Sequence, residues 1–316
     1  MNSSLNIIIV TYNATKWIDK CFANFVDMPQ NWEVVVIDNN SSDDTVNILK
    51  QNYPFVKIIQ SDENLGFAKA NNVGLARALK NNVDNVLLLN QDAWISVDDI
   101  KKLIELQNKN PEYYILSPLH YNGAGTDLDC NFSKYLECCG ELFKDYMLHN
   151  IQKEIYSTNY CNAAIWLLSR DCLKNIGGFN PTFYHYAEDD NYLHRLFYHG
   201  GKLGLVPTIK GFHDREKRQA NPKFFGRLNL EYRVKILLDL SNPNISNEKL
   251  FTKVFYRYLK SCIFYLMIFR YDRFNYKFEI LSKYIKIRKE MYSNLIKSKQ
   301  KQANFIEKET TYGIHR

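Results

Sequence analysis

The chain of 316 residues lacks several patterns that would assign it to a familiar class. It contains no CxxC pair, which argues against a zinc ribbon. Its seven cysteines are scattered and odd in number, which fits reduced thiols in a cytosolic protein better than a disulfide framework. Thirteen glycines and eight prolines are too few for a collagen-like or linker-like chain. Neither GxGxxG nor GxxxxGK[ST] occurs, which argues against the corresponding dinucleotide and P-loop sites.

Long apolar segments are also missing. The longest strongly apolar run, residues 262–269, is shorter than the ~20 residues that cross a bilayer. The first four residues show no basic region followed by an apolar stretch, so we expect no secretory signal. The 46% of hydrophobic residues is ordinary for a globular protein. We therefore expect a folded cytoplasmic protein, attached at most to the inner face of a membrane.

Charge is unevenly distributed along the chain, whose formal net charge is +7. Residues 251–316 contain ten Lys and five Arg against five acidic residues, a net charge of +10, which leaves −3 for residues 1–250. Such a basic segment attracts anionic lipid, nucleic acid or acidic partners, and a solvated helical face is the simpler explanation. No RNA- or DNA-binding motif accompanies the charge, so we expect no nucleic-acid partner.

Residues 1–220 alternate between strand and helix patterns. Short β-branched runs without polar alternation are typical of strands buried on both faces. We predict strands at 6–11, 33–38, 56–59, 85–89, 113–116, 161–169 and 203–206. Helices are predicted at 14–26, at about 43–50 with a cap at Ser42 or Asp43, and at 67–79, 97–107, 170–175 and 189–198. This alternation predicts an α/β domain with a mostly parallel sheet.

The remaining residues, 221–316, are predicted to form a basic, aromatic-rich helical region. Its two long segments, 250–269 and 274–296, suit an interfacial membrane anchor, because Lys and Arg favour anionic lipid and aromatic rings favour the headgroup boundary. In the alternative interpretation, aromatic side chains pack onto the first domain or onto a second subunit of a homodimer. The residues concerned are Tyr256, Phe264, Phe269 and Tyr271. The segment around 119–160 shows no readable pattern.

Polar side chains stand at the carboxyl ends of three predicted strands. Thr11, Asp38 and Asp92 occupy these positions, and ligands of such sheets bind beyond this edge. Asp38 either forms a turn or accepts a hydrogen bond from a base or ribose. Asp92 either caps a helix or, through oxygen, binds Mg²⁺ or Mn²⁺. A phosphate-bearing ligand would then need basic side chains, for which Lys69 and Arg77 are candidates.

A second acidic group, Glu188, Asp189 and Asp190, follows an aromatic stretch at 183–186. Apolar walls raise the pKa of a carboxyl group and make it a better proton acceptor near neutral pH. The simpler explanation is an acidic helix start that complements the helix dipole. His213 follows another predicted strand and is either a metal ligand or a satisfied polar residue.

The order of these segments resembles that of the family 2 glycosyltransferases, inverting enzymes with the GT-A nucleotide-sugar fold. The matching stretches are 8–13, 36–43, 64–72, 88–92, 177–179 and 186–190, within residues 6–215. Their combination is far more specific than any single stretch. Within the family, the chain looks most like the rhamnosyltransferase-like branch that builds bacterial surface polysaccharides. The resemblance implies a mixed, mostly parallel sheet sandwiched by helices, with a C-terminal helical extension.

The resemblance also implies the reaction and its residues. A UDP- or dTDP-sugar would donate its sugar to a hydroxyl of a glycan or lipid-linked saccharide. The residues that would bind the nucleotide sugar are Thr11, Tyr12, Asn13, Asp38, Asn40, Asn64, Gly66, Phe67, Lys69, Asn72, Asn90 and Gln91. Asp92, as the last carboxylate of the DxD element, and His213 would coordinate Mn²⁺ or Mg²⁺. Asp189 would be the general base with Glu188 in support, and Asp190 is the alternative base.

Two positions depart from the family pattern. Asn90 stands where the DxD element begins, which lowers the negative charge available to a metal, and Asn191 stands where the EDxD pattern ends. They leave two other interpretations open. One is a nucleotidyltransferase, which would release pyrophosphate. The other is a non-catalytic module that binds a sugar or a nucleotide.

Overall fold

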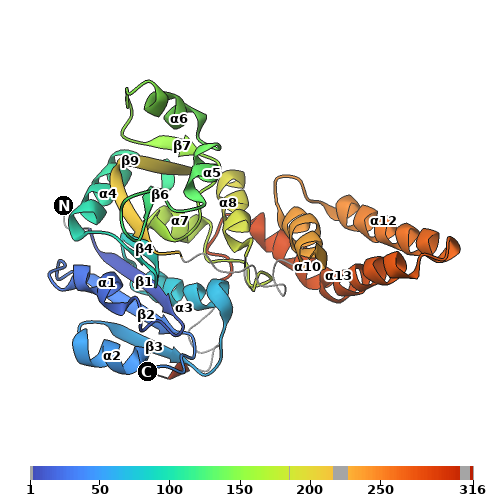
Figure 1. The fold of residues 1–316 in the computed structure, drawn as a ribbon, viewed down its shortest axis with the longest axis horizontal. Helices are drawn as coiled ribbons and strands as arrows, with labels where there is room; N and C mark the ends of the chain where they lie inside the picture. Colours follow the sequence, from blue (N-terminus) through green and yellow to red (C-terminus); the bar gives the residue numbers. More distant parts are fainter. Residues whose placement is uncertain (1–2, 185, 216–226, 307–313, 316) are drawn as a thin grey trace.

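The computed structural model of the chain describes residues 3–184, 186–215, 227–306 and 314–315. Figure 1 shows an α/β body and, on one side of it, an arm of helices that ends in a free tip. The arm contains α12 (Glu248–Met267) and α13 (Tyr271–Ser298). Among the described residues, no helix combines the length and the apolar character needed to cross a bilayer.

One mixed sheet of ten strands forms the centre of the described body. The strands are β1 (Leu5–Thr11), β2 (Trp32–Asp38), β3 (Lys57–Ser61), β4 (Asn85–Asn90), β5 (Ala93–Trp94), β6 (Tyr113–Asn122), β7 (Tyr156–Thr158), β8 (Ile165–Ser169), β9 (Lys202–His213) and β10 (Ile314–His315). Their order is β10-β3-β2-β1-β4-β8-β6-β9-β5, with β7 on β9. Neighbours from β3 to β4 are parallel, β8 is antiparallel to β4 and β6, and β6 and β9 are parallel. The predicted mixed, mostly parallel sheet is confirmed.

Helices cover both faces of the sheet because alternate strand residues point to opposite sides. Ile8 and Val35 belong to the core beneath one set of helices, and Ile7 and Val34 belong to the core beneath the other. The first set comprises α3 (Gly66–Lys80), α5 (Phe132–Leu136), α6 (Gly140–Met147), α7 (Arg170–Asn175) and α8 (Glu188–Tyr198). The second comprises α1 (Ile18–Phe22), its 3₁₀ continuation (Ala23–Phe25), α2 (Thr45–Asn52) and α4 (Val97–Lys109). These buried strands are continuous apolar runs for this reason.

Two strands are longer than the sequence predicts. We expected strands at 113–116 and 203–206, but β6 continues to Asn122 and β9 to His213. Their pairing shifts register between Pro118, opposite Val206, and the next residue, opposite Lys210. The shift leaves residues 207–209 out of the ladder, and Pro207 ends the readable strand pattern because proline cannot donate to a ladder.

The first helix is shorter than predicted. Residues 14–17 form a turn, and α1 begins only at Ile18. The backbone N–H of Ala14 donates to Oγ1 of Thr45 at 2.7 Å, and that of Thr15 donates to Asp43 at 3.4 Å. Asp43 also accepts from the backbone N–H of Thr45, and α2 starts at Thr45 rather than near Asp43. Side chains of the segment after β2 thus hold the loop after β1 in place beside the edge of the sheet.

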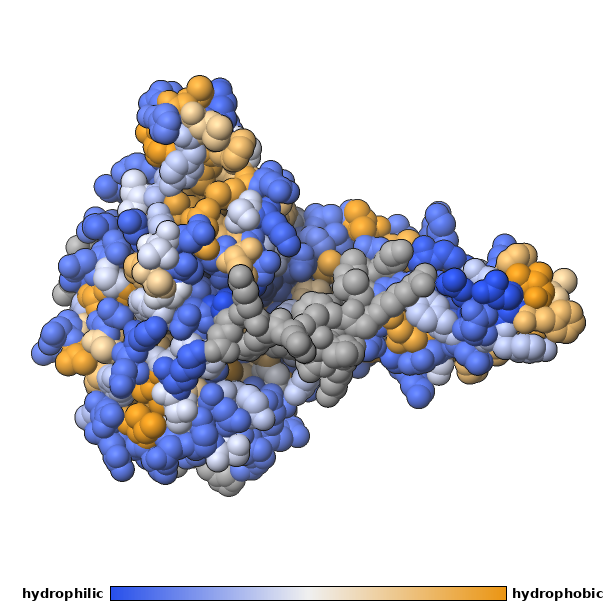
Figure 2. All heavy atoms as spheres, viewed as in Figure 1, coloured by the Kyte–Doolittle hydropathy of each residue, from blue (hydrophilic) through white to orange (hydrophobic). Residues whose placement is uncertain are grey.

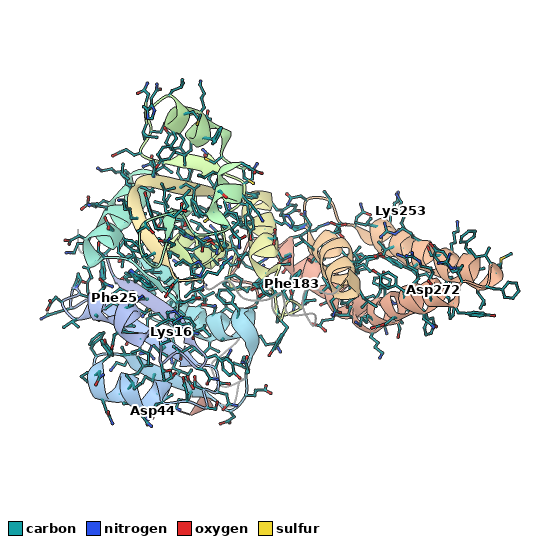
Figure 3. The ribbon with its side chains drawn as sticks, in the orientation of Figure 1. Lys16, Phe25, Asp44, Phe183, Lys253 and Asp272 are labelled. Carbon is teal, nitrogen blue, oxygen red and sulfur yellow. The ribbon has the colours of Figure 1, made fainter. Side chains whose placement is uncertain are left out.

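The arm has a hydrophobic core of its own. It begins with α10 (Arg227–Tyr232), a π-helical turn (Arg233–Leu238) and α11 (Asp239–Ser241), and its core includes Val254, Ile280 and Leu295. Phe183 of the body joins this core and lies between body and arm in Figure 3. The predicted C-terminal helices are therefore present.

The exposure of four aromatic side chains on the arm contradicts one interpretation of their role. Tyr256, Phe264, Phe269 and Tyr271 are all exposed, so none of them packs onto the body. The arm core is formed instead by side chains such as Phe251 on the inner faces of the two helices.

The chain returns to the body after α13. The backbone N–H of Gly178 donates to the carbonyl of Asn304 at 2.8 Å, and Asn72 donates to the carbonyl of Phe305 at 3.0 Å. The guanidinium of Arg195 lies 5.0 Å from the centre of the Phe305 ring. The segment 301–306 thus belongs to the body rather than to the arm.

Candidate active site

A cavity of about 560 Å³ opens at the carboxyl ends of β1, β2 and β4. Its lining combines amides, one carboxylate and aromatic rings: Val10, Tyr12, Asn13, Trp17, Asn39, Asn64, Gly66, Phe67, Asn90, Gln91, Asp92 and Tyr184. Polar groups set among aromatic walls are typical of a small-molecule site at this edge of a sheet. Of the twelve predicted nucleotide-sugar residues, seven are in this lining.

The loops after β1 and β4 are tied together across the cavity. The backbone N–H of Tyr12 donates to Oε1 of Gln91 at 2.7 Å, and Nε2 of Gln91 donates to the Tyr12 carbonyl at 3.2 Å. Asn13 accepts from the backbone N–H of Ser42 at 2.9 Å and has φ +50°, a left-handed conformation that asparagine tolerates. These bonds fix one wall of the cavity before any ligand arrives.

Asp38 does not line the cavity; its hydrogen bonds hold the neighbouring loop residues in place. It is buried, and its oxygens accept from Oγ1 of Thr11 at 3.0 Å and from Oγ of Ser41 at 2.6 Å. Its neighbour Asn39 lines the cavity, donates to Asn64 at 3.0 Å, and accepts from the N–H of residue 65. We did not predict Asn39, whose carboxamide orders two loops at once. Asn40, with φ +64°, follows Asn39 and is outside the lining.

Gly66 allows the start of α3 to lie close to Tyr184, on another wall of the cavity. Its φ is +76°, and a Cβ there would lie 2.5 Å from the Tyr184 carbonyl oxygen. The Tyr184 hydroxyl donates to the Asn64 carbonyl at 3.3 Å. Phe67 follows in the lining, whereas Lys69 is half-buried on α3 outside it. Only glycine combines this backbone conformation with this contact.

Two polar residues of the prediction hold the fold together instead of facing the cavity. Asn72 is buried; it accepts from the N–H of Phe179 at 2.6 Å and donates to the carbonyls of Phe179 and Phe305. Arg77 donates two hydrogen bonds to Glu33, at 3.0 and 2.9 Å. Our suggestion of Arg77 as a phosphate-binding residue is therefore wrong.

Asp92 and His213 meet at the edge of the cavity. Ala93 pairs with His213 across β5 and β9, which brings Nε2 of His213 to 3.4 Å from Oδ1 of Asp92. The other imidazole nitrogen lies 2.9 Å from the buried Asp129. Burial lowers the pKa of His213, but interactions with Asp129 and Asp92 raise it more, so that its pKa is above the usual value.

This donor set fits a divalent cation. A carboxylate oxygen faces an imidazole nitrogen, and a second carboxylate stands behind the imidazole, as it does behind many metal-bound histidines. A mixed oxygen and nitrogen set favours Mn²⁺ over Mg²⁺. Among the described residues, no group of three His, Cys, Asp or Glu side chains could enclose an ion, so a ligand's oxygens would have to complete the coordination.

The two acidic groups of the prediction converge on this edge. The backbone N–H of Asn90 donates to the Ala164 carbonyl at 2.9 Å, and the adjacent Ala163 donates its N–H to Oδ2 of Asp189 at 3.2 Å. Arg215, 3.9 Å from Asp129, also interacts electrostatically with Asp189. Topology thus places Asp189 beside the end of β4.

The environment of Asp189 suits a proton acceptor. Its Oδ1 is shielded from solvent and has no hydrogen-bond partner among the described residues. Burial raises the pKa of Asp189 from 3.8 to about 7; the charge of Asp190 adds to this, and the Ala163 N–H and Arg215 oppose it. Tyr186 and Ala187, just before α8, have φ of +67° and +69°. Consecutive left-handed non-glycine residues of this kind are typical of functional sites.

The other residues of this segment have different surroundings. Glu188 is the buried first residue of α8, and Asp190 is half-buried. Asn191 is buried and donates to Oγ of Ser241 at 3.1 Å. The position where the EDxD pattern would end therefore connects the body to the arm.

Comparison with known proteins agrees with this geometry. The model of glycosyl transferase family 2 matches residues 6–177. The chain belongs to this family. The match covers all the residues of the cavity lining except Tyr184, and its last residue, Gly177, precedes the acidic segment of α8.

Several known glycosyltransferases are similar to this chain. The low-salt glycan biosynthesis hexosyltransferase Agl10 of Haloferax volcanii is 25% identical over 80% of this chain and 78% of its own length. The dTDP-rhamnosyl transferase RfbF of Shigella flexneri is 25% identical over 67% of this chain and 70% of its own. The rhamnosyltransferase WbbL of Escherichia coli is 25% identical over 70% and 86%, respectively. These relatives agree with the rhamnosyltransferase-like resemblance.

Solved structures share the fold. Residues 1–349 of TarS from S. aureus, in complex with UDP, superpose with a TM-score of 0.56 at 17% identity, over 90% of this chain and 71% of that one. GalNAc-T7 with UDP, GalNAc and Mn²⁺ gives a TM-score of 0.54 at 15% identity, over 90% and 57%. The GT-A fold that the resemblance implies is therefore confirmed for this glycosyltransferase.

Proposed function

We propose that this glycosyltransferase moves a sugar from a UDP- or dTDP-sugar to a hydroxyl of a glycan or lipid-linked saccharide, with inversion at the anomeric carbon. What supports the proposal is that Asp92 lines the polar and aromatic cavity, and that Asp189 accepts from Ala163, whose neighbour Ala164 accepts from Asn90 of the same lining. In this assignment the donor occupies the cavity. The acceptor hydroxyl approaches from the side of Asp189.

The reaction is a single displacement. The acceptor oxygen forms a bond to the anomeric carbon while the bond from that carbon to the diphosphate oxygen breaks, and the nucleoside diphosphate leaves with the electron pair. Asp189 takes the proton of the acceptor hydroxyl, for which its pKa of about 7 is well matched near neutral pH. General-base catalysis of this kind contributes ~10²–10⁴-fold to the rate.

Asp92 and His213 would hold the divalent cation, with Asp129 orienting the imidazole. When bound, such a cation neutralises charge on the departing diphosphate. Tyr12, Trp17 and the amides around them would enclose the nucleotide. Lys69, outside the lining, would reach the diphosphate only if its side chain moved.

Two relatives are named as rhamnosyl transferases and two solved neighbours contain UDP, which supports a uridine or thymidine nucleotide in the donor. We also propose a role in surface polysaccharide synthesis, which the rhamnosyltransferase-like resemblance implies; one relative, Agl10, is named for glycan biosynthesis. All seven cysteines are free thiols, which supports a reducing, cytoplasmic location. We further propose that residues 1–220 carry the reaction and residues 221–316 the attachment, apart from the returning segment 301–306.

The test is a transfer assay with the full chain, Mn²⁺, a panel of UDP- and dTDP-sugars, and glycan and lipid-linked saccharide acceptors. We expect one donor to release nucleoside diphosphate and to yield a sugar of inverted configuration by NMR. Release of pyrophosphate would identify a nucleotidyltransferase. Binding of a nucleotide sugar in a thermal-shift assay without any turnover would identify a non-catalytic module.

A further inference from the structure

Large apolar side chains are exposed at the free end of the arm, where α12 turns into α13. We call residues 263–271 the tip. Ile263, Phe264, Leu266, Met267, Ile268, Phe269 and Tyr271 are 46–74% exposed. Figure 2 shows these apolar atoms gathered at the end of the arm farthest from the body. Contiguous exposed apolar surface of this kind marks an interaction site more often than a chance arrangement.

The arm core does not require the tip. The last fully buried side chain on α12 is Cys262, and the first on α13 is Ile280. Every residue from 266 to 273 is exposed. The tip therefore extends beyond the region that stabilises the helix pair, and its apolar side chains have no packing role there.

The turn itself uses an unsuitable residue for its backbone conformation. Phe269 has φ +55°. The N–H of Arg270 donates to the Tyr265 carbonyl at 2.9 Å, and that of Phe269 donates to the Leu266 carbonyl at 3.2 Å. This pattern ends a helix and places its left-handed residue at position 269, where glycine is preferred. This phenylalanine is 74% exposed and is not part of the arm core, so its side chain is available for an external contact.

Basic residues surround the tip. Between residues 253 and 277 the sequence carries six Lys or Arg and one acid, Asp272, a net charge of +5. The flanking cations are Lys253, Arg257, Lys260, Arg270 and Arg273, all of them exposed. Figure 3 shows Lys253 on the outer side of α12. Asp272 already interacts with Arg270 and Arg273, at 3.2 and 3.7 Å, so it neutralises only part of this charge.

We propose that the tip inserts into the interfacial layer of a bilayer that contains anionic lipid. Apolar side chains of the tip would enter the acyl boundary while the flanking cations contact lipid phosphates, the arrangement by which peripheral proteins bind membranes. A second copy of the tip is a poorer partner, because two surfaces of charge +5 repel each other. The inference deepens the proposed function, on whose assignment of attachment to residues 221–316 it rests, and it is tested separately because membrane binding requires no donor sugar.

The experiment is vesicle flotation of the full chain without any nucleotide sugar. Vesicles are made of phosphatidylcholine alone or of phosphatidylcholine and phosphatidylglycerol in equal amounts. The test variant combines Met267→Ser with Phe269→Gly. We expect binding to the anionic vesicles to fall by about tenfold or more, while the thermal midpoint holds or rises because glycine suits the conformation at 269. The Arg270→Gln and Arg273→Gln pair should weaken the preference for anionic lipid, because it lowers the net charge of residues 253–277 from +5 to +3.

A matched control removes similar exposed side chains elsewhere. Phe143 and Met147 on α6 are 55% and 66% exposed, and Phe143→Ser with Met147→Ser should bind vesicles like the parent chain. The proposal is overturned if the parent chain stays in solution, if the tip variant binds as well as the parent, or if the α6 variant loses binding instead. A parent dimer that the tip variant converts to monomers, with flotation unchanged, would make the tip a chain–chain interface. Donor release, measured separately, tests the proposed transfer independently.

Discussion

Replacing Asp189 by Asn should abolish turnover and at the same time stabilise the protein above neutral pH. In the folded chain the Asp189 pKa is raised to about 7 by burial, whereas an unfolded aspartate ionises near 3.8. At a pH between these two pKa values, Asp189 is protonated in the folded chain and ionised in the unfolded chain, so unfolding releases a proton. The contribution of Asp189 to the free energy of unfolding therefore becomes progressively less favourable as pH rises from about 4 to about 7. This difference between the folded and unfolded pKa corresponds to roughly 4 kcal/mol at most. Because Asp189 keeps some solvent contact, we expect about half of that.

The measurement is a thermal-unfolding series from pH 4 to pH 8.5. Asp189→Asn should match the parent near pH 4 and exceed it by about 2 kcal/mol, or about 3 °C in Tm, above pH 7. The asparagine can still accept from the Ala163 N–H, so local packing is kept. Turnover of the parent should rise with pH to a plateau above about pH 7, and the variant should lose ~10²–10⁴-fold while still binding UDP. Asp190→Asn is the control. A variant that is equally destabilised at every pH, or that retains turnover, would refute the assignment of Asp189 as base.

Three further changes test the site. Asp129→Asn should weaken Mn²⁺ binding about 10–100-fold by calorimetry, and unchanged affinity would place the metal elsewhere. Gly66→Ala should destabilise by about 2 kcal/mol in urea unfolding and abolish UDP binding, since its Cβ would meet the Tyr184 carbonyl; a normal midpoint would contradict this. Asn72→Ala should cost about 2–3 kcal/mol of stability through lost bonds, including that to Phe305, with an unchanged donor KM. A raised KM with normal stability would instead return Asn72 to the donor pocket.

The strands that form the cavity could be predicted because their signal is local. Continuous β-branched runs place β1, β2 and β4 within one or two residues of their observed bounds, and parallel order then brings Thr11, Asp38 and Asp92 to one edge. The acidic segment of α8 was also found from its composition. What composition could not give is that Asp189 meets Ala163, because that contact depends on β8 lying antiparallel beside β4.

Other site residues carry no local signal. Asp129 lies in an irregular segment, and only the long pairing of β6 with β9 brings it to His213. Side-chain amides are ambiguous for a different reason. Asn39, Asn72 and Asn191 look alike in sequence, yet the first faces the cavity and the other two hold distant segments. Their partners lie 25 or more residues away, beyond the reach of periodicity.

The bonds from Gly178 and Asn72 to residues 304 and 305 have a consequence for how this protein is made. During synthesis the chain leaves the ribosome from its N-terminus, and domains generally fold as they emerge. Here the body cannot complete its contacts until residues 304 and 305 have been translated, since Asn304 and Phe305 are among its buried parts. A premature stop anywhere in the arm would therefore leave the body without its contacts to residues 304 and 305. Quality-control proteases could then degrade the incompletely folded body.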